Sequence, residues 1–324
     1  MNSIKGQKIK ELIKYFCCLI CLTVIPSQAF PWGPATHAYL ANELSREKLD
    51  SNEICDAIYG AMLPDLFNLM LESRDYEYWV VQTHYHLTKL KNKARRMGLD
   101  AFAFGFVSHN ERWGADYIAH RRKRVKEESY VVRKARFLDY QLRPQLEAVL
   151  EEAGLPWAFW WAGQISPDLS HTLIEVAVDL LIKRNEYPAI GLEMLRSSTV
   201  RSPAIPDLLV AAYGRGFAHH MRISYEEASQ LIRDAEEEFQ NETIHFGEAL
   251  ALEESEAIKE LADQGAVLLN EILKAAIGSD VTLTSQTLEE FIKLAIHEIE
   301  EDYRQEVAAT LSYLEASRGF LRLP

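Results

Sequence analysis

Residues 108–120 read SHNERWGADYIAH, and this stretch carries the strongest structural signal in the chain. Asp116 and His120 follow His109 by seven and eleven residues. At about 100° per residue, both offsets fall within about 20° of the direction of His109, so on a helix the three side chains share one stripe. Because eleven residues rise about 16 Å, one ion could not reach both histidines. If helical, the stretch predicts a stripe that supplies His109 and Asp116 to one metal centre and His120 to a neighbouring one, with Asp116 able to bridge.

A second pair of ligand-type residues lies further along the chain. His171 and Glu175 stand at i and i+4, where a helix places them one above the other and lets them hold one ion. Asp179, at i+8, lies about 80° round from His171. A lone pair of this kind is usually structural, but Glu175 and Asp116 both lie among apolar, helix-forming residues, where an unpaired charge is costly to bury. A metal ion would neutralise that charge.

Two shorter elements add further candidates. Asp65 directly follows Pro64, and His84 and His86 are two residues apart. Because side chains two residues apart on a helix point in different directions, only one of these two histidines is expected to be a ligand. Imidazole and carboxylate ligands without thiolates favour zinc over manganese or iron. Four other histidines lack such surroundings of apolar helix, acid and imidazole and are predicted to be structural: His219, His220, His245 and His297.

Composition sets the fold class. The chain has 324 residues, of which 48% are hydrophobic and 26% charged, which excludes a disordered or low-complexity protein. With 15 Gly and 11 Pro and no stretch of clean period-two alternation, the sequence favours an all-α fold. Together with the ligand-type residues above, it predicts a multi-helix bundle around a multinuclear metal site. The formal net charge of −13 makes nucleic acid an unfavourable partner, and it also opposes long-range attraction to anionic membranes.

The N-terminus has the pattern of a secretory signal. Four lysines precede an apolar run over residues 15–25, and Ser27-Gln28-Ala29 offers the small residues that a signal peptidase accepts. A run of this length is shorter than the ~20 residues that span a bilayer, so residues 1–29 are predicted to be a cleaved signal rather than an anchor. The expected protein is exported, periplasmic or secreted. It would keep Cys55 as its one cysteine and carry 31 positive against 47 negative charges.

Helical periodicity extends over most of the remaining chain. Pro203 and Pro206 fall in a Ser- and Thr-rich stretch, which predicts a break between a helical domain over residues 30–200 and a helical region over residues 201–324. Residues 225–239, 253–277 and 288–314 are predicted to be amphipathic helices. The basic segments 91–96 and 121–136 are most simply solvated helix faces or loops.

An aromatic group precedes His171 and has two interpretations. It could pack in the core, or it could form an apolar wall for a lipid or a contact with a membrane surface. Its members are Trp157, Phe159, Trp160 and Trp161.

The ordered motifs resemble a known family. They are WGPATH at 32–37, GAMLPD at 60–65, THY at 83–85, the segment 105–120 and HTLIE at 171–175. Their order is similar to that of the bacterial zinc-dependent phospholipase C family, which shares its helical fold and trinuclear zinc site with the fungal single-strand nucleases. The resemblance covers roughly residues 32–180.

The resemblance implies two or three zinc ions. One zinc would be held by Asp65, His84, His109 and Asp116, a second by His120, His171 and Glu175, and a third by His37 with Asp116. In the family, the third zinc is completed by the free amine and carbonyl of an N-terminal tryptophan, which corresponds here to Trp32. Cleavage after Ala29 would leave two residues ahead of that tryptophan.

The implied activity is a phospholipase C-type hydrolysis of phospholipids by zinc-bound hydroxide, with Asp65 orienting or deprotonating the water. The expected partner is a phospholipid or another phosphodiester, with peripheral contact to a membrane. Two alternatives stay open. One is a zinc-dependent nuclease, and the other is a non-catalytic helical scaffold whose 201–324 region binds a partner.

Overall fold

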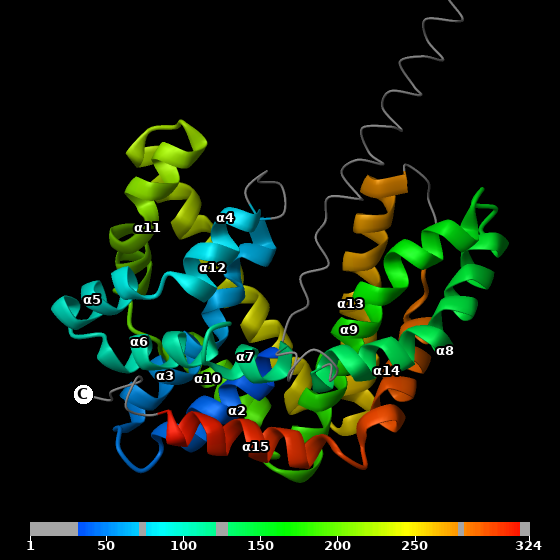
Figure 1. Ribbon diagram of the computed structural model, residues 1–324, viewed down its shortest axis with the longest axis horizontal. Helices are drawn as coiled ribbons and strands as arrows, with labels where there is room; N and C mark the ends of the chain where they lie inside the picture. Colours follow the sequence, from blue (N-terminus) through cyan, green and yellow to red (C-terminus); the bar gives the residue numbers. More distant parts are fainter. Residues whose placement is uncertain (1–31, 71–75, 121–128, 278–281, 318–324) are drawn as a thin grey trace, which may run out of the picture.

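The computed structural model describes residues 32–70, 76–120, 129–277 and 282–317, and the elements within these ranges are helices (Figure 1). The all-α fold class is therefore confirmed. The predicted signal peptide, residues 1–29, lies outside the described residues. Within the described part of the chain, none of the helices combines the length and the apolar character needed to cross a membrane.

The elements follow one another with mostly short connections. Two of them are not α-helices: η1 is a 3₁₀ helix and η2 is a π-helix. The order is α2 (Pro34–Ser45), α3 (Ser51–Met62), η1 (Leu63–Met70), α4 (Tyr76–Val80), η2 (Val81–Tyr85), α5 (Thr88–Met97), α6 (Asp100–His109), α7 (Ala115–His120), α8 (Tyr130–Glu152), α9 (Ala158–Asn185), α10 (Ile190–Val200), α11 (Ile205–Met221), α12 (Tyr225–Ala251), α13 (Glu254–Ile277), α14 (Ser285–Ile299) and α15 (Tyr303–Ala316).

Several helix ends are fixed by side chains that satisfy the free backbone groups. Asp50 accepts hydrogen bonds from the first turn of α3, and Glu53 reaches back to the Asp50 backbone, which completes a capping box. Ser224 and Thr284 cap α12 and α14, and each side chain accepts one backbone hydrogen bond from the first turn. Gly98 ends α5 in the left-handed region, with φ of 70°.

Helices α3 and α6 pack unusually closely because a glycine on each faces the other. A Cβ atom on Gly60 would overlap the carbonyl oxygen of Phe102, and one on Gly105 would overlap that of Ala57. This close approach brings the C-terminal end of α6 beside the C-terminal end of α3. The last residue of α6, His109, is thereby held against the backbone of Ala61.

The helical chain is interrupted near residue 200, and the residues on the two sides share one core. Helix α10 ends at Val200 and α11 starts at Ile205. Across the break, the Tyr59 hydroxyl on α3 donates to Glu236 on α12 at 2.8 Å, and Arg201 donates to the other oxygen of Glu236 at 2.8 Å. The C-terminal region therefore packs on the N-terminal one through the buried Tyr59–Glu236 hydrogen bond as well as apolar contacts.

The predicted single helix over residues 288–314 is wrong. The chain ends α14 at Ile299, turns, and begins α15 at Tyr303. The turn lets the buried Tyr303 hydroxyl donate to the Leu181 carbonyl on α9, at 3.2 Å. The preceding Asp302 accepts from the Tyr130 hydroxyl at 2.6 Å, so tertiary contacts to α8 and α9 decide where the helix stops.

Helices α8 and α9 form a long hairpin that carries the predicted aromatic group at its tip. Trp157 has φ of 66° and is 74% exposed, and Phe159 is 61% exposed. Core packing is therefore wrong for these two. Trp160 and Trp161 are half-buried and contact each other edge to face, with centroids 4.7 Å apart.

Candidate metal centre

Five of the predicted ligands come together from five different elements. They form what we call the central cluster: His37 on α2, Asp65 on η1, His84 on η2, His109 on α6 and Asp116 on α7. The ligand atoms of His37, Asp65 and His109 lie within 4.8 Å of one another, as do those of His84, His109 and Asp116. His109 belongs to both groups, so the five side chains make one connected cluster.

The segment 108–120 is not one helix, which corrects the predicted stripe. Helix α6 ends at His109, and the Asn110 side chain accepts hydrogen bonds from the backbone N–H groups of Arg112 and Trp113 at 2.8 and 3.0 Å. This tight turn needs Gly114, because a Cβ atom there would lie 2.6 Å from the Asn110 backbone. Side chains seven residues apart therefore meet through a turn rather than through helical periodicity.

Asp116 occupies the middle of the central cluster and faces different imidazoles with its two oxygens. Its Oδ2 lies 2.8 Å from Nε2 of His109 and 3.4 Å from Nε2 of His84. Its Oδ1 lies 3.2 Å from Nε2 of His37. The side chain is fully buried. This is the position that a carboxylate bridging two ions requires.

The two histidines that face Asp116 Oδ2 are oriented by hydrogen bonds on their far nitrogens. The Thr83 hydroxyl donates to the Trp79 carbonyl at 3.0 Å, so it accepts from Nδ1 of His84 at 2.8 Å. Nδ1 of His109 donates to the Ala61 carbonyl at 2.8 Å. With the Nδ1 atoms acting as donors, each Nε2 turns toward the cluster, and the two Nε2 atoms lie 3.2 Å apart.

The π-helix η2 places His84 in the central cluster. One turn of π-helix shifts the register of the chain relative to an α-helix, and such turns are frequent at functional sites. His84 is buried, whereas His86, two residues further on, is exposed. Only one of the two histidines therefore faces the cluster, as their spacing predicts.

Four acceptor atoms of the cluster lack hydrogen bonds to the described residues. Within the described residues, Nε2 of His37, Oδ1 of Asp65 and both oxygens of Asp116 are buried without one. Burial of so many acceptors around one point is costly unless a cation lies among them. The residues present therefore fit a bound metal ion.

The charges of the cluster shift the pKa values of its members. Burial alone would raise the pKa of Asp65 and Asp116, but the adjacent His109 holds the pKa of both carboxyls below the usual range. Burial would lower the pKa of His109, but Asp116 and Asp65 raise it well above normal. Burial and His109 lower the pKa of His37, whose ring stacks on His109 at 3.8 Å.

The second predicted pair lies on α9. Nε2 of His171 is 3.0 Å from Oε1 of Glu175, and both side chains are buried. Burial raises the pKa of Glu175 well above normal, and the charges of Asp65, Asp179 and Asp116 raise it further, so the pair lies within electrostatic reach of the central cluster. The third predicted ligand of this site, His120, ends α7, but its side chain lies outside the described residues.

Asp179 is a residue whose role sequence reasoning missed. Its carboxylate accepts from the backbone N–H groups of Ala35 and Thr36 at 3.0 and 2.7 Å, and from the Thr36 hydroxyl at 2.6 Å. It therefore caps the N-terminus of α2 from another helix. Gly33 is required beside it, because a Cβ atom there would overlap the Asp179 carboxylate. Burial raises the pKa of Asp179 to about 7.

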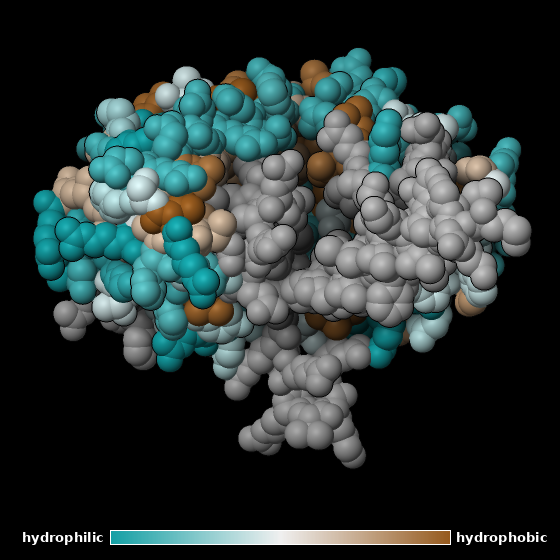
Figure 2. All heavy atoms as spheres, turned by 90° about the horizontal axis from the view of Figure 1, so that it is seen from above, coloured by the Kyte–Doolittle hydropathy of each residue, from teal (hydrophilic) through white to brown (hydrophobic). Residues whose placement is uncertain are grey.

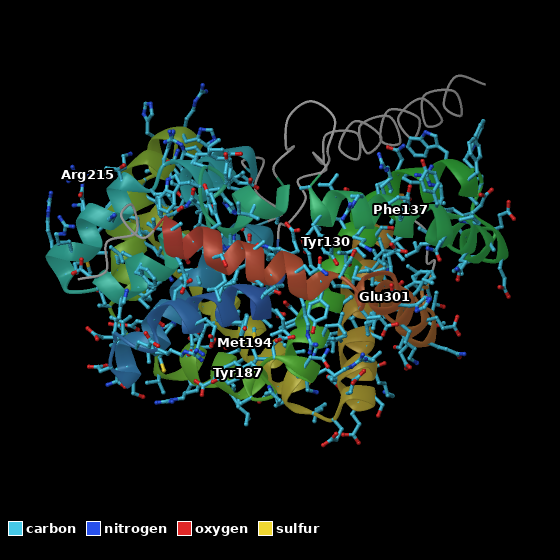
Figure 3. The ribbon with its side chains drawn as sticks, turned by 60° about the horizontal axis from the view of Figure 1, so that its bottom comes forward. Tyr130, Phe137, Tyr187, Met194, Arg215 and Glu301 are labelled. Carbon is cyan, nitrogen blue, oxygen red and sulfur yellow. The ribbon has the colours of Figure 1, made fainter. Side chains whose placement is uncertain are left out.

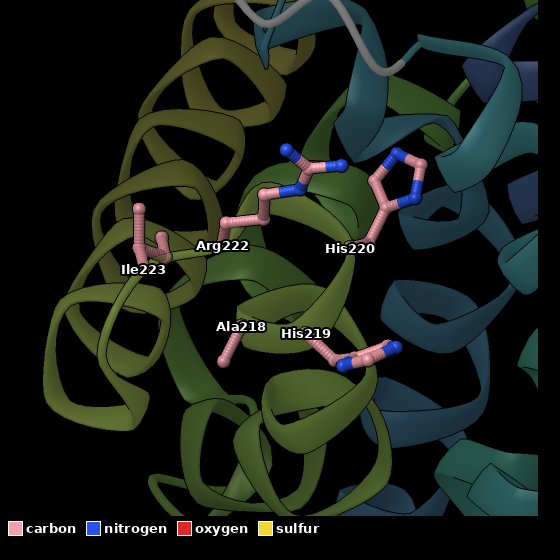
Figure 4. Close-up of a pocket in the computed structure, with 5 residues that line it drawn as sticks. All are labelled: Ala218, His219, His220, Arg222 and Ile223. Carbon is pink, nitrogen blue, oxygen red and sulfur yellow. The ribbon is translucent and has the colours of Figure 1, made fainter.

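Trp32, the remaining predicted ligand, is packed in the core, and two of the histidines predicted to be structural lie at the end of α11. Trp32 is buried against Tyr130, with ring centroids 6.3 Å apart, and its indole N–H lacks a partner within the described residues. At the end of α11, His219 and His220 line a cavity of about 660 Å³ together with Arg222 (Figure 4).

Comparison with known proteins found no match: no family model, no curated protein and no solved structure matches the chain. The likeness to zinc-dependent phospholipases C therefore rests on the ordered motifs alone.

Proposed function

We propose that this chain is an exported zinc-dependent phosphodiesterase that hydrolyses phospholipids in the manner of a phospholipase C. The observation that carries the proposal is the central cluster, where buried ligand atoms from five elements face one another. Within the described residues, those of His37, Asp65 and Asp116 lack hydrogen bonds. A donor set of imidazole and carboxylate without thiolate suits zinc.

The residues that would hold zinc follow from the geometry. His84 and His109 lie beside Oδ2 of Asp116, and His37 lies on its Oδ1 side. Oδ1 of Asp65 lies 3.6 Å from Nε2 of both His84 and His109. His171 and Glu175 supply two further ligands on α9. When bound, zinc makes water acidic enough to ionise near neutral pH and offsets the charge of a phosphodiester.

The protein's own residues would then orient water and substrate. Asp65 is the member of the central cluster that retains solvent exposure, with 14% of its side chain accessible, whereas the other four side chains are at most 4% exposed. A carboxylate at the open edge can accept a hydrogen bond from incoming water and so orient it. The hydrogen bonds at Nδ1 of His84 and His109 hold these two imidazoles in a fixed orientation toward the cluster.

The first experiment measures zinc content and hydrolysis together. We expect at least two zinc ions per chain and hydrolysis of phosphatidylcholine in preference to single-stranded DNA, with activity lost in Asp65→Asn. Asp139→Asn, a buried carboxylate on α8 paired with Arg143 and Ser166, is the matched control and should keep both properties. Preferential cleavage of DNA would identify a nuclease. One ion or none, with no hydrolysis, would identify a scaffold.

A further inference from the structure

Helix α5 concentrates positive charge in a chain that is acidic overall. Residues 78–99 contain no Asp or Glu, whereas the whole chain has a formal net charge of −13. We call the cations of this helix the basic face: Lys89, Lys91, Lys93, Arg95 and Arg96.

One side of α5 is fixed in the core, and the other meets solvent. Leu90 and Ala94, at i and i+4, are fully buried and attach the helix to α6 and α11. Lys89, Arg95 and Arg96 are exposed. Helices α5 and α11 lie together at the left end of the molecule in Figure 1, and the view from above shows this end as largely hydrophilic (Figure 2).

The stability of α5 accounts for only part of these charges, because only Arg95 and Arg96 lie in the last turn, where the helix dipole favours cations. Lys89 and Lys93 form a like-charge pair at i and i+4, as do Lys91 and Arg95, and such pairs weaken a helix. Lys89 also lies in the first turn, where the helix dipole disfavours a cation. Within the described residues, Lys89, Lys93 and Arg96 have no ion pair. Arg95 lies 3.9 Å from Asp100, which is an exposed pair of little strength.

Exposed apolar side chains accompany the basic face at both ends of the helix. Val81 and Tyr85 on η2 are 39% and 41% exposed, and Met97 in the last turn of α5 is 38% exposed. Cations beside exposed apolar and aromatic groups are typical of a surface that binds the interface of a lipid bilayer. A nucleic acid backbone would use the cations but would gain little from the aliphatic groups.

The neighbouring end of α11 extends the positive charge. His220 of α11 stacks on Tyr78 of α4 with ring centroids 4.3 Å apart, so this end lies against the segment that leads into α5. Arg222 follows it and is exposed. Arg215, also exposed, lies on the outer side of α11 (Figure 3).

The basic face is also close to the central cluster along the chain. Helix α5 begins at Thr88, four residues after His84. The exposed Trp157, by contrast, precedes His171 by fourteen residues, or about 21 Å along α9. The α8–α9 hairpin lies at the opposite end of the molecule in Figure 1. A bilayer on the basic face that also contacts Val81 and Tyr85 would lie against η2, the element that carries His84.

We propose that the basic face, with Val81, Tyr85 and Met97, is a docking surface for an anionic phospholipid bilayer. The proposal deepens the proposed function and rests on it for its biological meaning. The acidic remainder of the chain does not prevent docking, because salt screens charges beyond about 8 Å at physiological ionic strength. Each basic side chain at an anionic surface strengthens binding roughly fivefold.

The test measures binding of the purified full chain to vesicles. We expect sedimentation with vesicles of phosphatidylcholine containing phosphatidylglycerol, much weaker sedimentation with pure phosphatidylcholine, and loss of binding at high salt. Lys89→Gln/Lys93→Gln/Arg96→Gln should weaken binding about 100-fold, by the fivefold factor for each charge. Circular dichroism and the unfolding temperature check that this variant folds.

A matched control removes the same charge elsewhere. Arg46, Lys259 and Lys293 are exposed cations paired with acids on their own helices, so Arg46→Gln/Lys259→Gln/Lys293→Gln should bind vesicles as the parent chain does. Equal loss in both triple variants would reduce the effect to net charge and overturn the proposal. Loss in Trp157→Ala with full binding by the α5 variant would assign docking to the hairpin tip instead.

Two further outcomes separate the sources of failure. Tighter binding to single-stranded DNA than to phosphatidylglycerol vesicles at equal phosphate concentration would overturn the lipid assignment. Hydrolysis of detergent-dispersed phosphatidylcholine is measured separately on the parent chain. Its absence, together with vesicle binding that depends on the basic face, would reject the phospholipase function and leave the docking surface in place.

Discussion

The central cluster and the ligand-type residues of α9 both consist of imidazoles and carboxylates, but they are built in different ways. His171, Glu175 and Asp179 form what we call the α9 row, spaced four residues apart on a single helix. The central cluster draws one residue from each of five elements. Helical periodicity alone creates the row, whereas the cluster exists only once the elements are packed. The cluster should therefore depend on tertiary structure far more than the row does.

The largest effect is expected for Asp116→Ala. This side chain touches three imidazoles, so its loss should remove at least one zinc per chain and abolish hydrolysis. An ion at a thousand times its Kd stabilises the native state by about 4 kcal/mol, and the variant should lose a comparable amount. Elemental analysis and thermal unfolding with and without chelator check this result. Retention of the full zinc content would show that Asp116 is not a ligand.

Glu175→Gln and His171→Ala test whether the row holds an ion of its own. Each change leaves one ligand of the pair on α9, so we expect the loss of one zinc and at least a 100-fold decrease in hydrolysis, while the central cluster keeps its metal. Glu236→Gln is a matched control, because Glu236 is a buried carboxylate that pairs with Arg201 away from the cluster. If Glu175→Gln also emptied the central cluster, the two sites would be a single unit.

The contrast between the two regions also explains what the sequence could predict. The spacing of His171 and Glu175 is visible in the sequence, and the structure has them 3.0 Å apart on one helix. The meeting of His109 and Asp116 was expected from helical periodicity, but it depends on the turn at Asn110 and Gly114. No local pattern marks that turn as a substitute for a helix. Asp65 and His84 were grouped with residues 108–120 only through the resemblance of the ordered motifs to a known family.

Asp179 shows the opposite case, in which a regular spacing conceals a different role. It continues the four-residue spacing of the row, yet its oxygens are taken up by the N-terminus of α2. The partners lie 143 and 144 residues away in the sequence, so spacing could not reveal them. Because α2 carries His37, this cap links the row to the central cluster.

Asp179→Asn should have an intermediate effect. The amide N–H₂ would face the Ala35 N–H, so one of the two backbone hydrogen bonds is lost and a buried donor is left unpaired. We expect zinc affinity to fall 10- to 100-fold through displacement of His37. Thr36→Val removes the side-chain hydrogen bond alone and should cost about 1 kcal/mol of folding stability. Competition with a chelator measures the affinity. Unchanged zinc affinity in Asp179→Asn would limit Asp179 to a structural role.

The same residue predicts a pH dependence of the metal-free protein. The pKa of Asp179 is raised to about 7 in the folded state, whereas an unfolded aspartate titrates near pH 3.9. The folded state therefore keeps its proton while the unfolded state loses it. Folding stability should fall by about 4 kcal/mol as pH rises from about 4 to 7, and Asp179 should add no further change above pH 7. Urea unfolding across this range should show a flatter profile for Asp179→Asn.

The smallest effect is expected for His86→Ala, which sharpens the comparison at a single pair of residues. His86 is exposed and contacts Gln82 at 3.4 Å, whereas His84, two residues earlier, is buried with its Nε2 facing Asp116. Exposed substitutions away from such features usually change stability by less than about 0.5 kcal/mol. His86→Ala should therefore retain its zinc, its activity and its unfolding temperature, while His84→Ala loses zinc. The reverse pattern, with zinc lost only in His86→Ala, would mean that the π-helix η2 presents the other imidazole to the cluster and that the register of this segment differs by two residues.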